Sequence, residues 1–254
     1  MIKLALLKCM TVSSPLKGEH GDVSDMFQAF FSQQASRISL QIHATDQGDL
    51  PEPDASLDGI IISGSPCSPN ENLEWIKKAR QFIQTSHRQK KKMLGICFGH
   101  QLLADALGGK VKKAPQGWGL GVQPVSIHQQ MSWMEPAVKK CNIVVSYQDQ
   151  VIELPPGAKR LASNSHCPNF MFALGHHVLG IQGHPEFSKS FAKALYQSRQ
   201  EMLGHETVGL AMESLGHEVD SRLWLQWIYQ FFVSDLYLTN RGEQNPHPSG
   251  PPFL

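Results

Sequence analysis

Short apolar runs alternate with amphipathic segments over the first hundred positions of the chain. Four of these runs are expected to be buried strands: 2–7, 38–42, 59–66 (which ends in a Gly-Ser turn) and 93–96. Three intervening segments carry apolar residues at helical spacing, and they follow Asp22, Asn70 and Cys97. This order predicts an α/β fold with a doubly wound, mostly parallel sheet and helices on both faces.

The pattern changes in the second half of the chain. From 110 to 182, short apolar stretches are separated by turn-forming residues, and we expect a β-rich extension of the sheet. Two helices are expected after it, one around Leu195 and one over 223–232. Residues 1–238 are thus expected to form one domain, and 239–254, rich in Pro and Gly, a poorly ordered tail.

Composition and charge narrow the class of protein. The 254 residues are 41% hydrophobic and carry a formal net charge of +1, which gives no reason to expect a nucleic acid or an anionic membrane as partner. No apolar run reaches the ~18 residues that span a bilayer, and the short apolar N-terminus is expected to be a strand.

Five scattered cysteines suit a reducing compartment, so a cytoplasmic location is expected. The basic cluster 88–92 is expected to lie in a solvated loop.

The most informative motif is GICFGHQ, which runs from Gly95 to Gln101. Cys97 lies between a predicted strand and a predicted helix, with Gly95 and Gly99 two residues to either side. This is the G-x-nucleophile-x-G arrangement, with sulfur at the nucleophile position. The helix dipole favours a thiolate there. An unpaired cysteine is most often a small core residue, but this context favours a nucleophile.

A thiol nucleophile needs a base and a group that orients the base. Of the twelve histidines, His184 has the matching setting, because it follows the apolar run VLGIQG and open α/β sheets bind ligands at the carboxyl ends of their strands. Glu186 lies two residues further on, and residues i and i+2 of an extended chain point the same way. An HxE taken alone is a weak signal. Together with the G-x-nucleophile-x-G motif around Cys97, the HxE motif predicts a catalytic triad of Cys97, His184 and Glu186.

An acyl-transfer site also needs donors for the oxyanion that develops on the attacked carbonyl. One expected donor is the backbone N–H of Phe98, next to the nucleophile. A second is expected from the SGSP turn, where Gly64 and Ser65 allow backbone amides to face the site. The alternative interpretation of SGSP is an ordinary tight turn.

The two motifs together resemble those of the class I glutamine amidotransferases, triad enzymes with a flavodoxin-like fold. GICFGHQ resembles the family's nucleophile motif, GHPEF at 183–187 resembles its His-Pro-Glu motif, and the resemblance covers about 2–232. It is strongest to the stand-alone branch described as GMP synthase-like, which also resembles the γ-glutamyl peptidases. The resemblance implies attack of Cys97 on the side-chain amide of glutamine, with His184 as base and acid and Glu186 as orienter. Ammonia leaves, and water hydrolyses the glutamyl thioester.

The resemblance also implies substrate-binding positions. Gln101, one helical turn past Cys97, matches a family residue that contacts the amino-acid end of the substrate. Ser146, Tyr147 and Gln148, in the segment SYQD, match the family's substrate-binding segment. The family usually has histidine at the position of Tyr147, and synthase-linked members have glycine at the position of Gln148. These departures make a bulkier γ-glutamyl group a candidate substrate beside free glutamine.

Synthase-linked members of this family deliver ammonia to an acceptor domain. No ATP-binding synthase domain is expected after Phe232, and no GxxxxGK[ST] loop occurs in the sequence. Three functions stay open: an amidotransferase with a synthase subunit in trans, a γ-glutamyl peptidase, and a non-catalytic protein that has kept the fold. The expected ligand is a small γ-glutamyl compound. No cofactor is expected, and no metal site, because His166 and Cys167 have no suitably spaced third ligand.

Overall fold

The computed structural model describes residues 1–33, 38–52 and 56–234. Its strands are β1 Ile2–Lys8, β2 Ile38–Ala44, β3 Gly59–Ile62, β4 Met93–Ile96, β5 Lys110–Lys113, β6 Gly119–Ile127, β7 Lys140–Tyr147, β8 Asp149–Glu153, β9 Lys159–Ser163, β10 Met171–Leu174 and β11 Val178–Ile181. Its helices are α1 Ser14–His20, α2 Val23–Ser32, the 3₁₀ helix η1 Thr45–Gln47, α3 Glu74–Arg88, α4 Phe98–Ala106, α5 Lys189–Ser198, α6 Gln200–Leu203, α7 His205–Ser214 and α8 Ser221–Val233.

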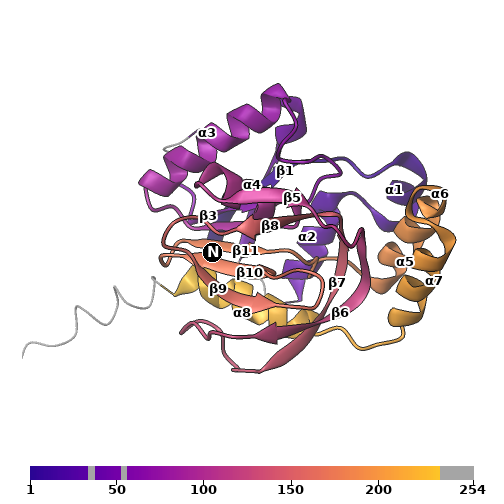
Figure 1. Ribbon diagram of the computed structural model, residues 1–254. Helices are drawn as coiled ribbons and strands as arrows, with labels where there is room; N and C mark the ends of the chain where they lie inside the picture. Colours follow the sequence, from indigo (N-terminus) through magenta and orange to yellow (C-terminus); the bar gives the residue numbers. More distant parts are fainter. Residues whose placement is uncertain (34–37, 53–55, 235–254) are drawn as a thin grey trace, which may run out of the picture.

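The main sheet has the order β2–β1–β3–β4–β11–β10–β9–β6–β7, and β5 pairs with β8 separately (Figure 1). The five strands from β2 to β11 are parallel. Helices α2 and α8 pack on one face of the sheet, and α3 and α4 on the other. A 2-1-3-4-5 strand order between two helical layers is the flavodoxin-like arrangement. The predicted fold class is therefore confirmed, and the carboxyl ends of β3, β4 and β11 meet at one edge of the sheet.

The remaining four strands form the expected β-rich extension, in which β10, β9, β6 and β7 pair in antiparallel fashion. Helices α5 to α7, here called the helical wall, pack against β6 and β7 through a separate small core (Figure 1). Tyr196 ties the wall to both strands. Its hydroxyl donates to the carbonyl oxygen of Val145 at 2.7 Å and accepts from the N–H of Gly121 at 3.1 Å.

The structure differs from the sequence-based expectations in several places. Helix α3 begins at Glu74 rather than near Asn70, and α1, α6 and α7 were not expected. The prediction of a solvated basic loop is wrong for Lys92, which is 6% exposed. Its ammonium donates to the carbonyl oxygen of Phe231 at 2.5 Å and to Ser234 Oγ at 2.6 Å. It thereby neutralises the negative end of α8, where helix carbonyls lack intrahelical donors.

Two further expectations concern the ends and surroundings of the chain. The predicted tail, 239–254, lies outside the described residues, and the domain boundary at 238 therefore stays a prediction. Within the described ranges, no helix combines the length and the apolar character that crossing a bilayer requires.

Candidate active site

The nucleophile elbow forms where β4 passes into α4. Cys97 is the N-cap of α4, with φ 52° and ψ −104°, and this left-handed φ is rare for a residue with a side chain. The flanking glycines make the turn sterically feasible. A Cβ on Gly95 would lie 2.4 Å from the backbone of Gly99, and a Cβ on Gly99 would lie 2.2 Å from the carbonyl oxygen of Ile62. Helix α4 therefore crosses β3 and β4 at a distance that only glycine permits.

The thiol of Cys97 lies among polar groups although the residue is only 5% exposed. Its sulfur is 3.7 Å from the carbonyl oxygen of Ser146 and 3.7 Å from Nε2 of Gln182. Cys97 also lines two cavities. The sulfur is thus covered from bulk solvent but accessible to a small ligand.

His184 follows β11 and is held from three directions. Its backbone N–H donates to the carbonyl oxygen of Val144 at 2.8 Å. Its ring stacks on Phe187 with centroids 3.9 Å apart and an interplanar angle of 10°. Its Nδ1 lies 2.8 Å from Oε1 of Glu186, and the two side chains are only 5% and 2% exposed. The arrangement fixes the ring orientation and leaves the other ring nitrogen free for the sulfur.

The electrostatics of this pair favour a charged imidazole. Burial alone would lower the pKa of His184, but the carboxylate of Glu186 and the sulfur of Cys97 outweigh it and raise the pKa to about 10. The ring is therefore protonated at neutral pH. A buried imidazolium beside a sulfur can stabilise a thiolate and can donate a proton to a leaving group.

The turn after β3 lies directly against the two reacting side chains. A Cβ on Gly64 would be 2.9 Å from Cε1 of His184 and 3.8 Å from Cβ of Cys97. The hydroxyl of Ser65 accepts from the N–H of Cys67 at 3.2 Å, which stabilises the turn. The N–H of Phe98 is the first of α4, and first-turn N–H groups have no partner inside the helix. The assignment of these groups as oxyanion donors stays a prediction.

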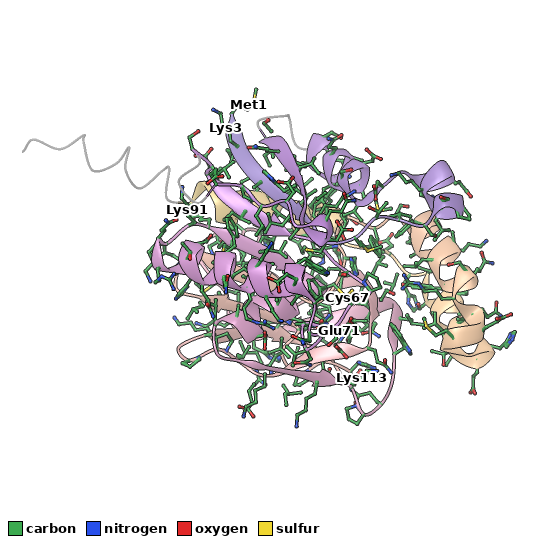
Figure 2. All side chains as sticks on the ribbon, turned by 90° about the horizontal axis from the view of Figure 1, so that it is seen from above. Met1, Lys3, Cys67, Glu71, Lys91 and Lys113 are labelled. Carbon is green, nitrogen blue, oxygen red and sulfur yellow. The ribbon has the colours of Figure 1, made fainter. Side chains whose placement is uncertain are left out.

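The larger of the two cavities, here called the front cavity, has a volume of about 1130 Å³. All four residues expected to bind substrate line it: Gln101, Ser146, Tyr147 and Gln148. Figure 2 labels three further lining residues, Cys67, Glu71 and Lys113, which lie below Met1, Lys3 and Lys91 in that view. The elbow, the segment after β7 and the helical wall thus enclose one space around the thiol.

Two of the expected substrate contacts have structural partners of their own. The side-chain nitrogen of Gln101 donates to the carbonyl oxygen of Asp149 at 2.6 Å and so joins α4 to β8. Tyr147 is 2% exposed and packs edge-on against the ring of His166. Burial raises the pKa of the Tyr147 hydroxyl, which therefore stays protonated. Gln101 and Tyr147 therefore line the front cavity and also make contacts that stabilise its wall.

One whole side of the site is formed by residues that carry no recognisable sequence motif. The helical wall contributes Arg199, Glu201, Met202 and His205 to the front cavity. Arg199, between α5 and α6, lines both cavities. The sequence signal available was weak, because these helices are short and carry no motif.

Comparison with known proteins agrees with this geometry. The family model for glutamine amidotransferase class-I matches residues 24–200. γ-Glutamyl peptidase 3 of Arabidopsis thaliana is 35% identical over 68% of this chain and 66% of its own length. The glutamine-hydrolyzing GMP synthase component of Saccharolobus solfataricus is 33% identical over 51% of this chain and 67% of its own. The crystal structure of a glutamine amidotransferase from Thermotoga maritima has a TM-score of 0.74 at 19% identity, covering 91% of this chain and 98% of that one.

The chain belongs to the class I glutamine amidotransferase family. It is an enzyme of the amidotransferase-type hydrolases, and the predicted resemblance is confirmed.

Proposed function

We propose that the protein hydrolyses a γ-glutamyl amide bond through a thioester on Cys97. The observation that carries the proposal is the buried contact of 2.8 Å between Nδ1 of His184 and Oε1 of Glu186, beside a cysteine held in the elbow conformation. The carboxylate holds the imidazole in one orientation and stabilises its charged form. The charged ring can in turn stabilise a thiolate and donate a proton to the leaving group.

The reaction divides into two halves. First, the sulfur of Cys97 attacks the side-chain carbonyl carbon and a C–S bond forms, while the N–H of Phe98 and the turn at 64–65 bind the oxyanion. His184 gives its proton to the amide nitrogen, the C–N bond breaks, and ammonia or an amine leaves. Water then loses a proton to the neutral ring and attacks the thioester. The C–S bond breaks, and glutamate leaves.

The size of the front cavity favours a γ-glutamyl peptide over free glutamine as substrate. At about 1130 Å³, it exceeds the ~300–1,000 Å³ that is usual for small-molecule pockets. In this proposal Gln101 and the segment 146–148 bind the glutamyl end, next to the sulfur. The remainder, lined by the helical wall, has room for the rest of a peptide. The similarity to a relative named as a γ-glutamyl peptidase supports the same choice.

A second candidate function keeps the same chemistry and changes the fate of the amine. The relative from Saccharolobus solfataricus is named as one subunit of a GMP synthase. This supports a protein that releases ammonia from glutamine for a synthase subunit in trans.

For either function we propose a cytoplasmic location, because the free cysteines Cys9, Cys67, Cys97, Cys141 and Cys167 suit a reducing compartment.

The test is a substrate screen of the wild type against Cys97→Ala. Glutamine, glutathione and simple γ-glutamyl amines are supplied, and released glutamate is measured. We expect the wild type to release glutamate, with larger kcat/KM for the peptide than for glutamine, and Cys97→Ala to be inactive. Cys141→Ala, at a buried cysteine of β7 that lines neither cavity, is the control and keeps activity. Release from glutamine alone favours the amidotransferase function, and release from none of the compounds favours a non-catalytic protein.

A further inference from the structure

The turn after β3 contains a buried hydroxyl group that no step of the proposed reaction uses. It belongs to Ser63, the residue that follows β3, which is 0% exposed. The hydroxyl oxygen lies 2.9 Å from the backbone nitrogen of Cys9 and 3.0 Å from the carbonyl oxygen of Gly64. A backbone N–H can only donate and a carbonyl oxygen can only accept. The hydroxyl therefore accepts from Cys9 and donates to Gly64.

The hydrogen bond to Gly64 determines how the next peptide unit is oriented. The carbonyl oxygen of Gly64 and the N–H of Ser65 belong to one peptide plane, and in a trans peptide they point in opposite directions. With the carbonyl held on the side of Ser63, the N–H of Ser65 points to the other side. Within the described part of the chain, this N–H donates to no acceptor. It is therefore available to a ligand.

The side to which this N–H points is the side of the thiol. Ser63 and Cys9 line neither cavity, whereas Ser65 and Cys97 line both. A Cβ on Gly64 would lie 3.8 Å from Cβ of Cys97. We propose that Ser63 is a positioning residue, which holds the peptide unit between Gly64 and Ser65 with its N–H towards the oxyanion. This inference rests on the proposed γ-glutamyl hydrolase function.

The hydroxyl matters because the opposite orientation of this peptide unit would oppose the reaction. Gly64 has no side chain to restrict its backbone torsions, and a buried carbonyl oxygen that loses its donor is costly. Without the Ser63 hydroxyl, the carbonyl is free to turn towards the polar groups around the thiol. An acceptor would then face the position where negative charge develops, and one oxyanion donor would be lost.

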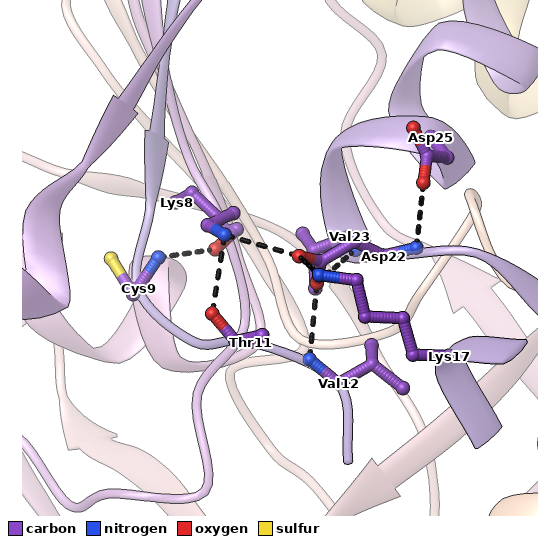
Figure 3. A network of polar contacts seen from close by, with 9 residues as sticks. Lys8, Cys9, Thr11, Val12, Lys17, Asp22, Val23 and Asp25 are labelled. Carbon is purple, nitrogen blue, oxygen red and sulfur yellow. Dashed lines mark hydrogen bonds and ion pairs between the residues drawn. The ribbon is translucent and has the colours of Figure 1, made fainter. Parts of the chain in front are cut away.

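Figure 3 shows the network that holds the loop after β1, which contains Cys9. Asp22 anchors this loop on both sides of Cys9: Oδ2 is paired with Lys8 at 3.1 Å, and Oδ1 accepts from the N–H of Val12 at 3.0 Å. The N–H of Cys9 is therefore held in place, and so is the Ser63 hydroxyl that accepts from it. A continuous set of polar contacts thus runs from Asp22 through this loop to the oxyanion turn.

The test separates acyl transfer from the reactivity of the thiol in Ser63→Ala. With γ-glutamyl-p-nitroanilide as substrate, we expect kcat to fall by about tenfold or more, because acyl transfer passes through an oxyanion. KM is expected to change less than about twofold, because Ser63 lines neither cavity. Methyl methanethiosulfonate has no carbonyl group and forms no oxyanion. Its rate of reaction with Cys97, followed by peptide mass spectrometry, is expected to change less than about twofold.

Two further variants distinguish positioning from a general effect on the fold. Ser63→Thr keeps the hydroxyl and is expected to recover most of kcat. Ser86→Ala removes the hydroxyl of a serine of α3 that is 2% exposed and lines neither cavity, and it is expected to change neither rate. If Ser63→Ala is too unstable to assay, Ser63→Cys, whose thiol is a weak donor, is expected to show the same fall in kcat with unchanged KM.

Three results would decide against these assignments. A normal kcat in Ser63→Ala would overturn the positioning role. An equal fall in acyl transfer and in thiol modification would also overturn it, because the whole site would then be disturbed. A wild type that reacts with methyl methanethiosulfonate at Cys97 but releases no amine from any γ-glutamyl compound would instead overturn the proposed function.

Discussion

Gly64 and His184 follow different strands of the sheet, yet they lie in contact: a Cβ on Gly64 would be 2.9 Å from Cε1 of the His184 ring. The ring cannot retreat, because Phe187 stacks on it and Glu186 binds its Nδ1. Any side chain at position 64 must therefore displace the base or the turn. The relationship couples the proposed oxyanion turn to the catalytic ring.

Gly64→Ala is expected to lower kcat by about tenfold to a hundredfold, since small displacements of an oxyanion donor or base have effects of this size. Stability is expected to change by about 1–3 kcal/mol or less, as for other cases of local overpacking. Steady-state glutamate release and thermal unfolding measure the two effects. Gly18→Ala, at a position with nothing within 4 Å of the added Cβ, is the control. A Gly64→Ala enzyme with normal kcat would contradict the coupling.

Glu186→Gln is expected to shift the alkaline limb of the pH–rate profile. The carboxylate is the main cause that raises the pKa of His184 to about 10, and the protonated ring is the form that donates to the leaving amine. In the wild type, activity should therefore persist through neutral pH and fall as the pH rises through about 10. In the variant this fall should begin at lower pH, with kcat/KM reduced at least tenfold at neutral pH. Identical alkaline limbs in both enzymes would show that Glu186 does not control the charge of the ring.

Asp22→Asn is expected to destabilise the fold in a manner that depends on pH. Burial opposes the charge on Asp22, but the N–H of Val12, Lys17, the N–H of Val23 and Lys8 outweigh it and lower the pKa to about 2. A carboxyl whose pKa is lower in the folded state stabilises the fold above its ordinary pKa of ~4, and this stabilisation is lost as the pH falls towards about 2. Urea unfolding should show a deficit of about 2 kcal/mol in the variant at pH 7, shrinking between pH ~4 and ~2.

Arg199→Ala is expected to discriminate between substrates. The guanidinium borders the front cavity at the helical wall, where the part of a peptide substrate beyond the γ-glutamyl group would lie, and guanidinium binds carboxylate in bidentate fashion. We expect KM for a γ-glutamyl peptide to rise about tenfold or more, with a smaller change for glutamine. Arg199→Lys should recover only part of the affinity, and Lys193→Ala, on the exposed side of α5, should change neither value. Equal effects on both substrates would place Arg199 at the glutamyl end instead.

The parts of the site that sequence predicts are those built from local motifs on strand ends. Cys97 lies in a turn that needs glycine at positions 95 and 99, because a side chain at either position would clash with the backbone. His184 and Glu186 follow β11, which pairs with β4, the strand that precedes Cys97. These positions could therefore be inferred without coordinates. Asp22 precedes a segment that the sequence predicts to be helical, and it is the N-cap of α2. Its bond to the N–H of Val12, however, depends on a loop whose path no local pattern reveals.

The remaining differences share one physical origin. Lys92 looks solvent-exposed in a basic run, and only the approach of α8, far along the chain, provides carbonyl and hydroxyl acceptors for its buried ammonium. Arg199 likewise lines the same cavity as Cys97 because the helical wall packs against β6 and β7. Contacts between distant segments are set by packing, and short helices with few apolar residues give little sign of where they will pack.

The hydroxyl of Tyr196 marks the point in the chain after which sequence changes would alter the cavity wall and leave the nucleophile turn unchanged. Because this group, on α5, binds the backbones of β6 and β7, changes in the length or composition of the following two helices would reshape the space available to the leaving amine while α5 stays attached to the sheet. Relatives with the same chemistry and different donors could therefore arise by exchange of this one segment.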